Sequence, residues 1–229
     1  MGISTLLPFW WDAIVGTLIL FGGGGILALV LGFIVGAARV SPIPIARAAG
    51  AVYVNWIRNT PLTLVMFFFA FAMPILLGAR VDSIMLATLA LGIYTATYVA
   101  ETIRSGVNTV PVGQAEAARA LGLGFGQVMG LVVLPQAFRS VVPPMMSVFI
   151  ALLKNTTVAA GFSVLNLGSV TAYLSEHREA GKGDNLLVTM MSGENQLLTL
   201  LLIAAIFVVL VLLLAWLQRV LETKWKVQR

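Results

Sequence analysis

Long apolar segments, separated by short polar ones, run through this sequence from end to end. Each is close to the roughly 20 residues that a helix needs to cross the ~30 Å hydrocarbon core of a bilayer. We predict an all-α polytopic membrane protein that forms a single transmembrane domain over residues 1–229. The five predicted membrane spans lie at about 13–38, 61–77, 84–103, 140–160 and 197–217.

The second apolar region is less regular than the others. It runs from about Ala48 to Leu77 and would be ~45 Å long as a straight helix, which is too long for one span. The sequence Arg58-Asn59-Thr60-Pro61 interrupts it, and a proline cannot continue the interior of a helix. We therefore interpret 48–57 as an interfacial elbow and 61–77 as the span itself.

Composition excludes several classes of protein. Hydrophobic residues make up 59% of the chain and charged residues only 10%, whereas soluble domains carry about 25% charged residues. The chain has no cysteine, which excludes disulfides and thiolate metal sites. The single histidine, His177, has no partner histidine, so we predict no metal site and interpret it as a solvated surface residue. The net charge of +5 does not indicate nucleic acid, because the charges lie at the ends of apolar segments.

The distribution of positive charge predicts how the chain is oriented. The first eleven residues contain no Lys or Arg, so we expect a retained span with its amino end outside rather than a secretory signal. Ten of the 14 Lys and Arg residues fall on predicted inner segments, three on outer segments and Lys154 within a span. This bias agrees with the positive-inside rule. It places the carboxyl end and residues 111–135 in the cytoplasm.

Residues 113–135 read GQAEAARALGLGFGQVMGLVVLP. Strong helix formers from Glu116 to Leu121 are followed by Gly122, Gly124 and Gly126, which stop the helix and turn the chain. An apolar run then ends at Leu134-Pro135. The pattern predicts a short helix, a glycine turn and a second short helix between two spans. An ordinary cytoplasmic loop helix is the alternative that these residues alone leave open.

The spacing within this segment resembles the EAA loop of bacterial ABC importer permeases. Glu116-Ala117-Ala118 is followed by three residues and Gly122, then by nine residues and Val132, then by one residue and Leu134-Pro135. The family usually has Ile where Val132 stands, a difference of one methylene. Further segments resemble the polar amino acid branch of these permeases, and their sequences are similar to those of actinobacterial glutamate permease subunits. They lie between about 39 and 164 and read RNTPL (58–62), YVAE (98–101), RSG (104–106), PVGQ (111–114) and KNTT (154–157).

The resemblance implies a MetI-like fold and a membrane-spanning subunit of an ATP-driven importer of polar amino acids. The amino acid is expected to be glutamate or a related one, and the location the bacterial plasma membrane. The implied partners are two ATPase subunits, a second permease subunit that we expect to be a different chain, and an extracellular amino-acid-binding protein. The chain contains no G-x-x-x-x-G-K-[ST] phosphate loop. We therefore expect no enzymatic activity and no cofactor in this chain, with ATP and Mg²⁺ on the partner ATPase subunits.

The resemblance also implies which residues couple the chain to an ATPase. They are Glu116, Ala117, Ala118, Gly122, Leu134 and Pro135. In this hypothesis Glu116 contacts a basic group on the ATPase, while Ala117 and Ala118 form a small flat face that fits a cleft on it. Gly122 permits the turn, and the segment transmits force to the spans on either side.

A second group of polar residues lies within the predicted spans. Tyr94, Thr97, Glu101 and Arg104 are spaced by 3, 4 and 3 residues, so they share one helix face. An ionised glutamate is costly in contact with lipid. Two interpretations stay open for this face: a wall of the translocation path, or an internal Glu101–Arg104 pair together with hydrogen bonds between helices.

The sequence Lys154-Asn155-Thr156-Thr157 lies deep in a span that also contains Pro143 and Pro144. Such a lysine faces protein or water, although it can also snorkel to the outer surface while the threonines bond to their own helix. We hypothesise that the path surrounds an amino acid with fixed charges of both signs. The residues of this path are Arg58, Thr60, Glu101, Lys154, Asn155 and Thr156.

The alternative function is an ion-gradient-driven secondary amino acid transporter. Such folds often contain two related halves, whereas this sequence has no internal repeat and five spans do not divide evenly. An enzyme embedded in the membrane is a third class. It finds no support, because the sequence shows no paired carboxylate, Ser/His or His-cluster constellation.

Overall fold

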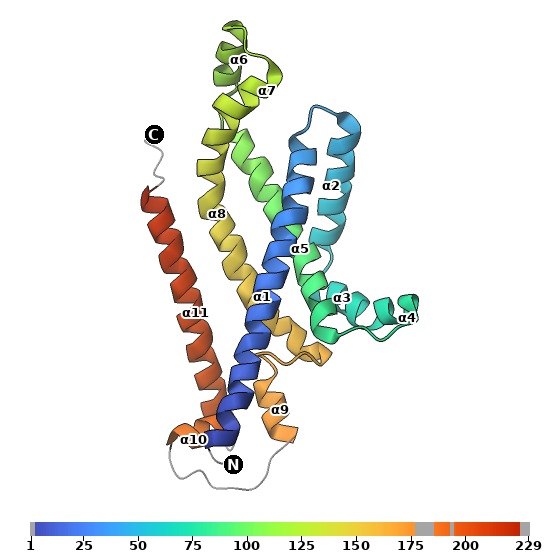
Figure 1. Cartoon of the computed structure of the whole chain (residues 1–229), viewed down its shortest axis with the longest axis vertical. Coiled ribbons are helices and arrows are strands. Elements are labelled where there is room, and N and C mark those ends of the chain that lie inside the picture. The colour runs from blue at the N-terminus through green and yellow to red at the C-terminus, as the bar shows by residue number, and fades with distance from the viewer. Residues whose placement is uncertain (1–2, 177–185, 193–194, 225–229) are drawn as a thin grey trace. The chain divides into compact units, whose positions relative to one another are not determined.

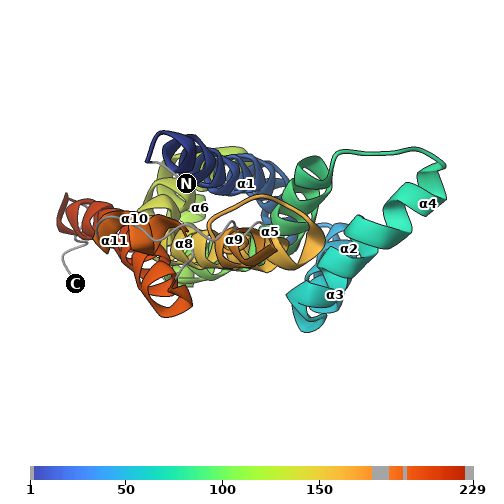
Figure 2. The same cartoon turned by 90° about the horizontal axis from the view of Figure 1, so that it is seen from below.

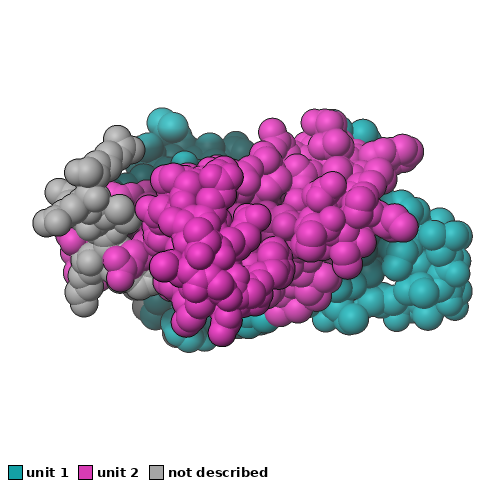
Figure 3. Space-filling model, turned by 90° about the horizontal axis from the view of Figure 1, so that it is seen from above, with its two compact units in different colours: residues 1–26, 61–92, 151–213 teal, residues 27–60, 93–150, 214–229 magenta. Residues whose placement is uncertain are grey.

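The computed structural model describes residues 3–176, 186–192 and 195–224, and every regular element in these ranges is a helix (Figure 1). These residues belong to two compact units, which Figure 3 colours separately. Unit 1 comprises Met1–Ile26, Pro61–Gly92 and Ala151–Leu213, and unit 2 comprises Leu27–Thr60, Ile93–Ile150 and Leu214–Arg229. The predicted surface residue His177 lies outside the described residues.

Several of the described helices are suited to a membrane. Four are long and apolar enough to cross one, and a fifth candidate arises when two helices on either side of a break count as one broken span. These candidates are Leu6–Val40, Ser83–Asn108, Phe125–Phe162, Gln196–Thr223 and the pair Pro44–Asn59 with Leu62–Leu77. The predicted all-α polytopic class is therefore confirmed.

The first two helices pack closely within unit 2. Helix α1 (Ile3–Val40) ends before a short connection, and α2 (Pro44–Asn59) begins with its proline in the first turn, where a missing N–H costs nothing. A Cβ built at Gly50 of α2 would lie 3.1 Å from the side chain of Arg39. The hydroxyl of Tyr53 donates a 2.7 Å hydrogen bond to the carbonyl oxygen of Ile93. The predicted elbow is thus part of a longer helix that begins before Ala48.

The break after α2 lies where the sequence predicts it. Thr60 has an extended backbone (φ −84°, ψ 131°), because the ring of Pro61 disfavours helical geometry in the residue before it. Helix α3 (Leu62–Phe67), the π-helix η1 (Phe68–Ala72) and α4 (Met73–Leu77) then form one continuous run (Figure 2). This run is about 24 Å long at 1.5 Å per residue, shorter than a hydrocarbon core. The span predicted at 61–77 therefore stays a prediction.

Two π-helical turns share a cause. Each of η1 (Phe68–Ala72) and η2 (Val128–Val133) ends two residues before a proline, Pro74 or Pro135. A proline inside a helix removes one hydrogen bond and its ring clashes with the carbonyl one turn earlier. Widening that turn to an i→i+5 pattern relieves the clash without breaking the helix. Both helical runs can therefore continue past their prolines.

The remaining long helices are α5 (Ser83–Asn108), α8 (Leu134–Asn155) and α11 (Gln196–Lys224). The 3₁₀-helix η3 (Thr156–Phe162) extends α8, and short helices α9 (Val170–Glu176) and α10 (Leu186–Ser192) precede α11. In unit 1 a core forms around α1 and α9–α11. Its buried members are Leu6, Trp10, Ala13, Leu167, Val170, Leu174, Met191 and Ile203. The indole N–H of Trp10 donates a 3.0 Å hydrogen bond to the carbonyl oxygen of Met191, which satisfies that buried donor.

Candidate functional site

A short helical hairpin lies at one end of α5 and α8 in unit 2 (Figure 1). It consists of α6 (Val112–Ala120), α7 (Phe125–Gln127) and η2. Gly122 turns the chain with φ +85°, a conformation that strains any residue with a Cβ. The N–H of Gly122 donates to the carbonyl oxygen of Arg119 (2.9 Å), and the N–H of Leu123 donates to that of Ala118 (3.2 Å). These two bonds form a Schellman motif at the end of α6. The predicted helix, glycine turn and second helix are all present.

The hairpin has a small core of its own. Ala118, Val128 and Val133 are buried, and the side chains packed against them include Val107, Val110, Ala115, Leu123, Met129 and Val132. Ala118 is only 5% exposed. The prediction that it shares an outward flat face with Ala117 is therefore wrong. Consecutive residues of a helix point about 100° apart, so one faces the core while the other faces out.

The outer surface of the hairpin combines one acidic residue with large apolar ones. Glu116 and Ala117 are exposed on α6. Leu121 and Phe125, on either side of the glycine turn, are 84% and 64% exposed. Sequence reasoning did not single out these two. The available signal was that these two large apolar residues stand next to glycines of the turn.

Leu134 and Pro135 do not belong to the exposed surface of the hairpin tip or to its core. They line an apolar cavity of about 890 Å³ together with side chains from α1 and α5, including Phe33, Val99 and Ile103. Leu134 is 49% exposed. The two residues that complete the EAA-like spacing thus lie with the long helices of unit 2 and not in the core of the hairpin.

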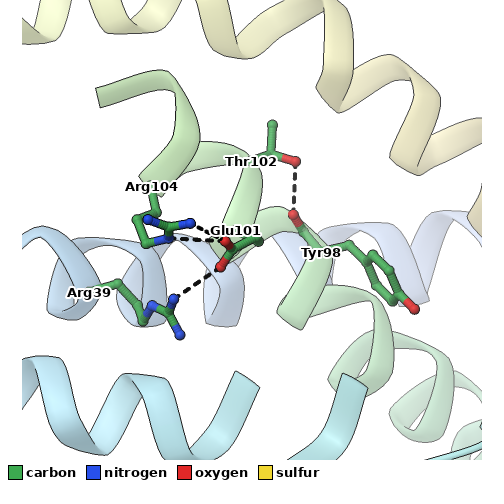
Figure 4. Close-up of polar contacts among 5 residues, drawn as sticks. All are labelled: Arg39, Tyr98, Glu101, Thr102 and Arg104. Carbon is green, nitrogen blue, oxygen red and sulfur yellow. Dashed lines mark hydrogen bonds and ion pairs between the residues drawn. The ribbon is translucent and has the colours of Figure 1, made fainter. Parts of the chain in front are cut away.

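A charged cluster joins two helices of unit 2. The Glu101 carboxylate accepts a 3.2 Å hydrogen bond from Nη2 of Arg39, at the end of α1 (Figure 4). Arg104, one turn along α5, donates Nε at 3.0 Å and also Nη2 to the other carboxylate oxygen. The internal Glu101–Arg104 pair is therefore present. Arg39 is an additional partner that sequence reasoning treated only as an inner positive charge.

Glu101 also faces a cavity, so the other interpretation of its helix face, a wall of the translocation path, stays open. The cavity has a volume of about 240 Å³ and lies in unit 2. The guanidinium carbon of Arg58 stands 6.0 Å from the ring centroid of Tyr98 at this cavity, within reach of a cation–π interaction. Its lining residues are Arg58, Tyr98, Glu101, Thr102, Ser105, Gly106, Thr109, Ser140, Pro144 and Val148.

The structure thus brings two of the predicted path residues, Arg58 and Glu101, to one cavity. Thr60 instead donates its hydroxyl to the carbonyl oxygen of Trp56 at 2.8 Å. The hydroxyls that do line the cavity, such as Thr102 and Ser140, were not predicted. No regular spacing within one segment marks them, because they come from α5 and α8, which lie apart in the sequence.

The predicted residues Lys154, Asn155 and Thr156 belong to unit 1. Lys154 is exposed and Asn155 half-buried, whereas Thr156 is buried. The hydroxyl of Thr156 donates to the carbonyl oxygen of Leu153, and that of Thr157 to Lys154, each at 2.7 Å. The threonines therefore bond to their own helix, as one of the two interpretations of this segment expects.

Comparison with known proteins decides the family. Residues 28–227 match the family described as "Binding-protein-dependent transport system inner membrane component". The chain belongs to this family. The prediction drawn from the spacing of Glu116 to Pro135 is thereby confirmed.

Relatives and solved structures agree with this assignment. The chain is 42% identical to the glutamate transport system permease protein GluC of Corynebacterium glutamicum over 178 residues, 73% of this chain and 75% of that one. It is 40% identical to the probable glutamine ABC transporter permease protein GlnP of Bacillus subtilis over 153 residues, 67% of this chain and 70% of that one. A crystal structure of an amino acid ABC transporter with histidines shares the fold, with a TM-score of 0.81, 24% identity and coverage of 97% and 96%. The MetNI methionine ABC transporter in an inward-facing conformation also shares the fold, with a TM-score of 0.65 and 18% identity. The match covers 97% of this chain and 99% of that one.

Family membership determines the general role of the chain. This permease is a membrane-spanning subunit of an ABC importer and a multi-pass protein of the cell membrane, with a MetI-like fold. Permease subunits of this family carry no ATPase site, so separate subunits hydrolyse ATP. The family also implies that the permease works with ATPase and binding-protein partners. A secondary transporter driven by an ion gradient is thereby excluded.

Proposed function

We propose that this permease carries glutamate or a closely related polar amino acid into the cell. The observation that carries the proposal is the 42% identity to a glutamate permease over 178 residues. A glutamine permease follows at 40% identity. These relatives define the substrate class more narrowly than the shared fold does, because one fold serves many substrates.

The proposed assembly contains two ATPase subunits, a second permease subunit that is a different chain, and an extracellular amino-acid-binding protein. ATP and Mg²⁺ are held by the ATPase subunits. The amino end of the permease faces outside and the carboxyl end faces the cytoplasm, in line with its positive charges. The hairpin of residues 112–133 then lies on the cytoplasmic side, where an ATPase can reach it.

In this proposal the hairpin is the coupling element. Glu116, Ala117, Leu121 and Phe125 form the exposed face that docks in a cleft of the ATPase. Ala118 supports this face from inside the hairpin core, and Gly122 sets the turn. When ATP binding closes the ATPase pair, the two docked hairpins move together. The permeases then switch from an inward-open to an outward-open state.

The cavity beside Arg58 and Glu101 is the proposed part of the translocation path in unit 2. It offers fixed charges of both signs, which suit an amino acid with its ammonium and carboxylate groups. Arg58 is exposed at the cavity, whereas Arg39 and Arg104 are already paired with Glu101. Arg58 is therefore the group available for a further carboxylate on the solute side chain. Lys154, Asn155 and Thr156 are proposed path residues of unit 1.

Uptake by the complete transporter tests the proposal. The complex, with its binding protein, is reconstituted in liposomes and supplied with ATP and labelled glutamate. We expect ATP-dependent accumulation that unlabelled glutamate abolishes, that glutamine lowers, and that histidine and arginine leave nearly unchanged. Equal competition by all four amino acids would overturn the proposed substrate class. Concentration of glutamate by this chain alone, without ATP, would overturn the mechanism.

A further inference from the structure

The hydroxyls of Thr109 and Ser140 meet where α5 comes close to α8 in unit 2. Gly106 makes this approach possible: a Cβ at that position would overlap the side chain of Val141 and lie 3.2 Å from the hydroxyl of Ser140. Glycine allows two helix backbones to approach in this way. The two hydroxyls therefore lie at a close contact between helices that are far apart in the sequence.

These hydroxyls have more acceptors within reach than they have protons. Thr109 Oγ1 lies 2.6 Å from the carbonyl oxygen of Gly106 and 3.0 Å from Ser140 Oγ. Ser140 Oγ lies 2.8 Å from the carbonyl oxygen of Ala137 and 3.2 Å from that of Gly106. Each hydroxyl carries one proton. Each hydroxyl can thus donate to either of two acceptors, and several arrangements of the protons are compatible with the same heavy-atom positions.

Two of these arrangements are the extremes: the first has both hydrogen bonds between the two segments, and the second has neither. In the first, Thr109 donates to Ser140 and Ser140 donates to Gly106, so both bonds cross from one helix to the other. In the second, Thr109 donates to Gly106 and Ser140 donates to Ala137, each three residues back in its own segment. Separation of α5 from α8 thus leaves each hydroxyl with an acceptor in its own segment.

The contact lies between the hairpin and the polar cavity. Gly106, Thr109 and Ser140 line the same cavity as Arg58 and Glu101. On the other side, Val107 and Val110 pack into the core of the hairpin, and α6 begins at Val112, three residues after Thr109. The contact is therefore the part of the cavity wall nearest in sequence to the hairpin, where a movement of the hairpin would act on the cavity. Small sliding between packed helices is a common route for such changes.

We propose that Thr109 and Ser140 are positioning residues for solute translocation. Their hydroxyls join the end of α5 to α8 in one state of the transport cycle and bond within their own chain segments in the other. The exchange lets hairpin movement change the width of the polar cavity. This inference rests on the coupling role proposed above for the hairpin.

Transport and ATP hydrolysis, measured in the same proteoliposomes of the complete complex, test the proposal. Thr109→Val and Ser140→Ala each remove one hydroxyl. We expect each to change the ratio of uptake to hydrolysis by about two- to tenfold, the factor that one neutral hydrogen bond is worth. The double variant should do no more than Ser140→Ala alone, because Ser140 takes part in both hydrogen bonds between the segments. Thr109→Ser keeps the hydroxyl and should restore the ratio.

Thr223→Val is the matched control. Thr223 is exposed on α11 and donates its hydroxyl three residues back, to Val220, as Thr109 does to Gly106. The ratio in this control should equal that of the unmodified complex. If Thr109→Val and Ser140→Ala also keep the normal ratio, or only lower the melting temperature, the proposal is overturned.

A cross-linking experiment follows the contact itself. The chain has no cysteine, so Thr109→Cys with Ser140→Cys introduces a single pair at a known position. We expect the disulfide yield to differ at least about twofold between the nucleotide-free complex and the complex trapped with ATP, Mg²⁺ and vanadate. The same yield in both states, or no disulfide in either, would contradict the proposal.

Gly122→Val separates this inference from the proposed function. If Gly122→Val keeps a normal ratio while the Thr109 and Ser140 variants change it, the coupling role of the hairpin fails. The two hydroxyls then act on translocation without the hairpin, and the hairpin-driven exchange is overturned. If only Gly122→Val changes the ratio, the hairpin couples and the role of the hydroxyls fails.

Discussion

Arg39, in the last turn of α1, donates a 3.2 Å hydrogen bond to the carboxylate of Glu101 in α5. The same carboxylate also pairs with Arg104, so one acid serves two guanidinium groups. The second Arg39 nitrogen, Nη1, is buried and has no hydrogen-bond partner among the described residues. Glu101 therefore offsets the repulsion between two arginines, Arg39 on α1 and Arg104 on α5.

Glu101→Gln should destabilise the permease. The substitution keeps the shape of the side chain but leaves two arginines facing a neutral amide. We expect a loss of about 1.5–3 kcal/mol, the value of a hydrogen bond to a charged group. The measurement is thermal unfolding of the purified complex in detergent. Asp12→Asn removes an exposed carboxylate outside the hairpin and should leave the unfolding temperature unchanged. An equal effect of both substitutions would argue against the Arg39–Glu101–Arg104 cluster.

Gly122→Val should uncouple ATP hydrolysis from uptake. A residue with a Cβ at φ +85° pays about 1–2 kcal/mol in the left-handed region, and the turn between α6 and α7 will shift. Hydrolysis should continue while uptake falls. Gly126→Ala is the control, because no atom outside its own helix lies within 4 Å of an added Cβ. Normal uptake per ATP in Gly122→Val would show that the turn plays no part in coupling.

Ala117→Leu and Ala118→Leu should fail in different ways. Ala118 lies in the core of the hairpin, so a larger side chain overpacks it at a cost of about 1–3 kcal/mol. Ala117 is exposed, so the same change leaves the fold intact but obstructs docking. Ala117→Leu should reduce co-purification of the ATPase at an unchanged unfolding temperature, whereas Ala118→Leu should lower that temperature. Similar results for both would contradict the inward orientation of Ala118.

Arg58→Ala should affect glutamate more than glutamine. The guanidinium of Arg58 is exposed at the polar cavity and is available for the side-chain carboxylate that only glutamate carries. The uptake rate at low concentration should fall about tenfold or more for glutamate, the effect of losing a charged hydrogen bond. Glutamine uptake should change little, and Thr60→Val should change neither. An equal loss for both amino acids would point to a structural role for Arg58.

Much of the local structure follows from the sequence alone. The long apolar segments determine a membrane protein, because only helices or closed barrels satisfy the backbone in lipid. Pro61 determines the break after α2, and Gly122 the turn after α6, since each residue restricts or permits a specific backbone conformation. The spacing from Glu116 to Pro135 was sufficient to indicate the family.

Tertiary structure decided which surfaces meet. Helical spacing shows that Ala117 and Ala118 face different directions, yet only packing against η2 makes Ala118 the buried one. Likewise, Arg39 reaches Glu101 across 62 positions of sequence, and Ser140 reaches Thr109 across 31. A periodic pattern defines the faces of one helix but carries no information on the face of another helix that packs against it. The charged cluster and the hydroxyl contact therefore exist only once the helices are packed together.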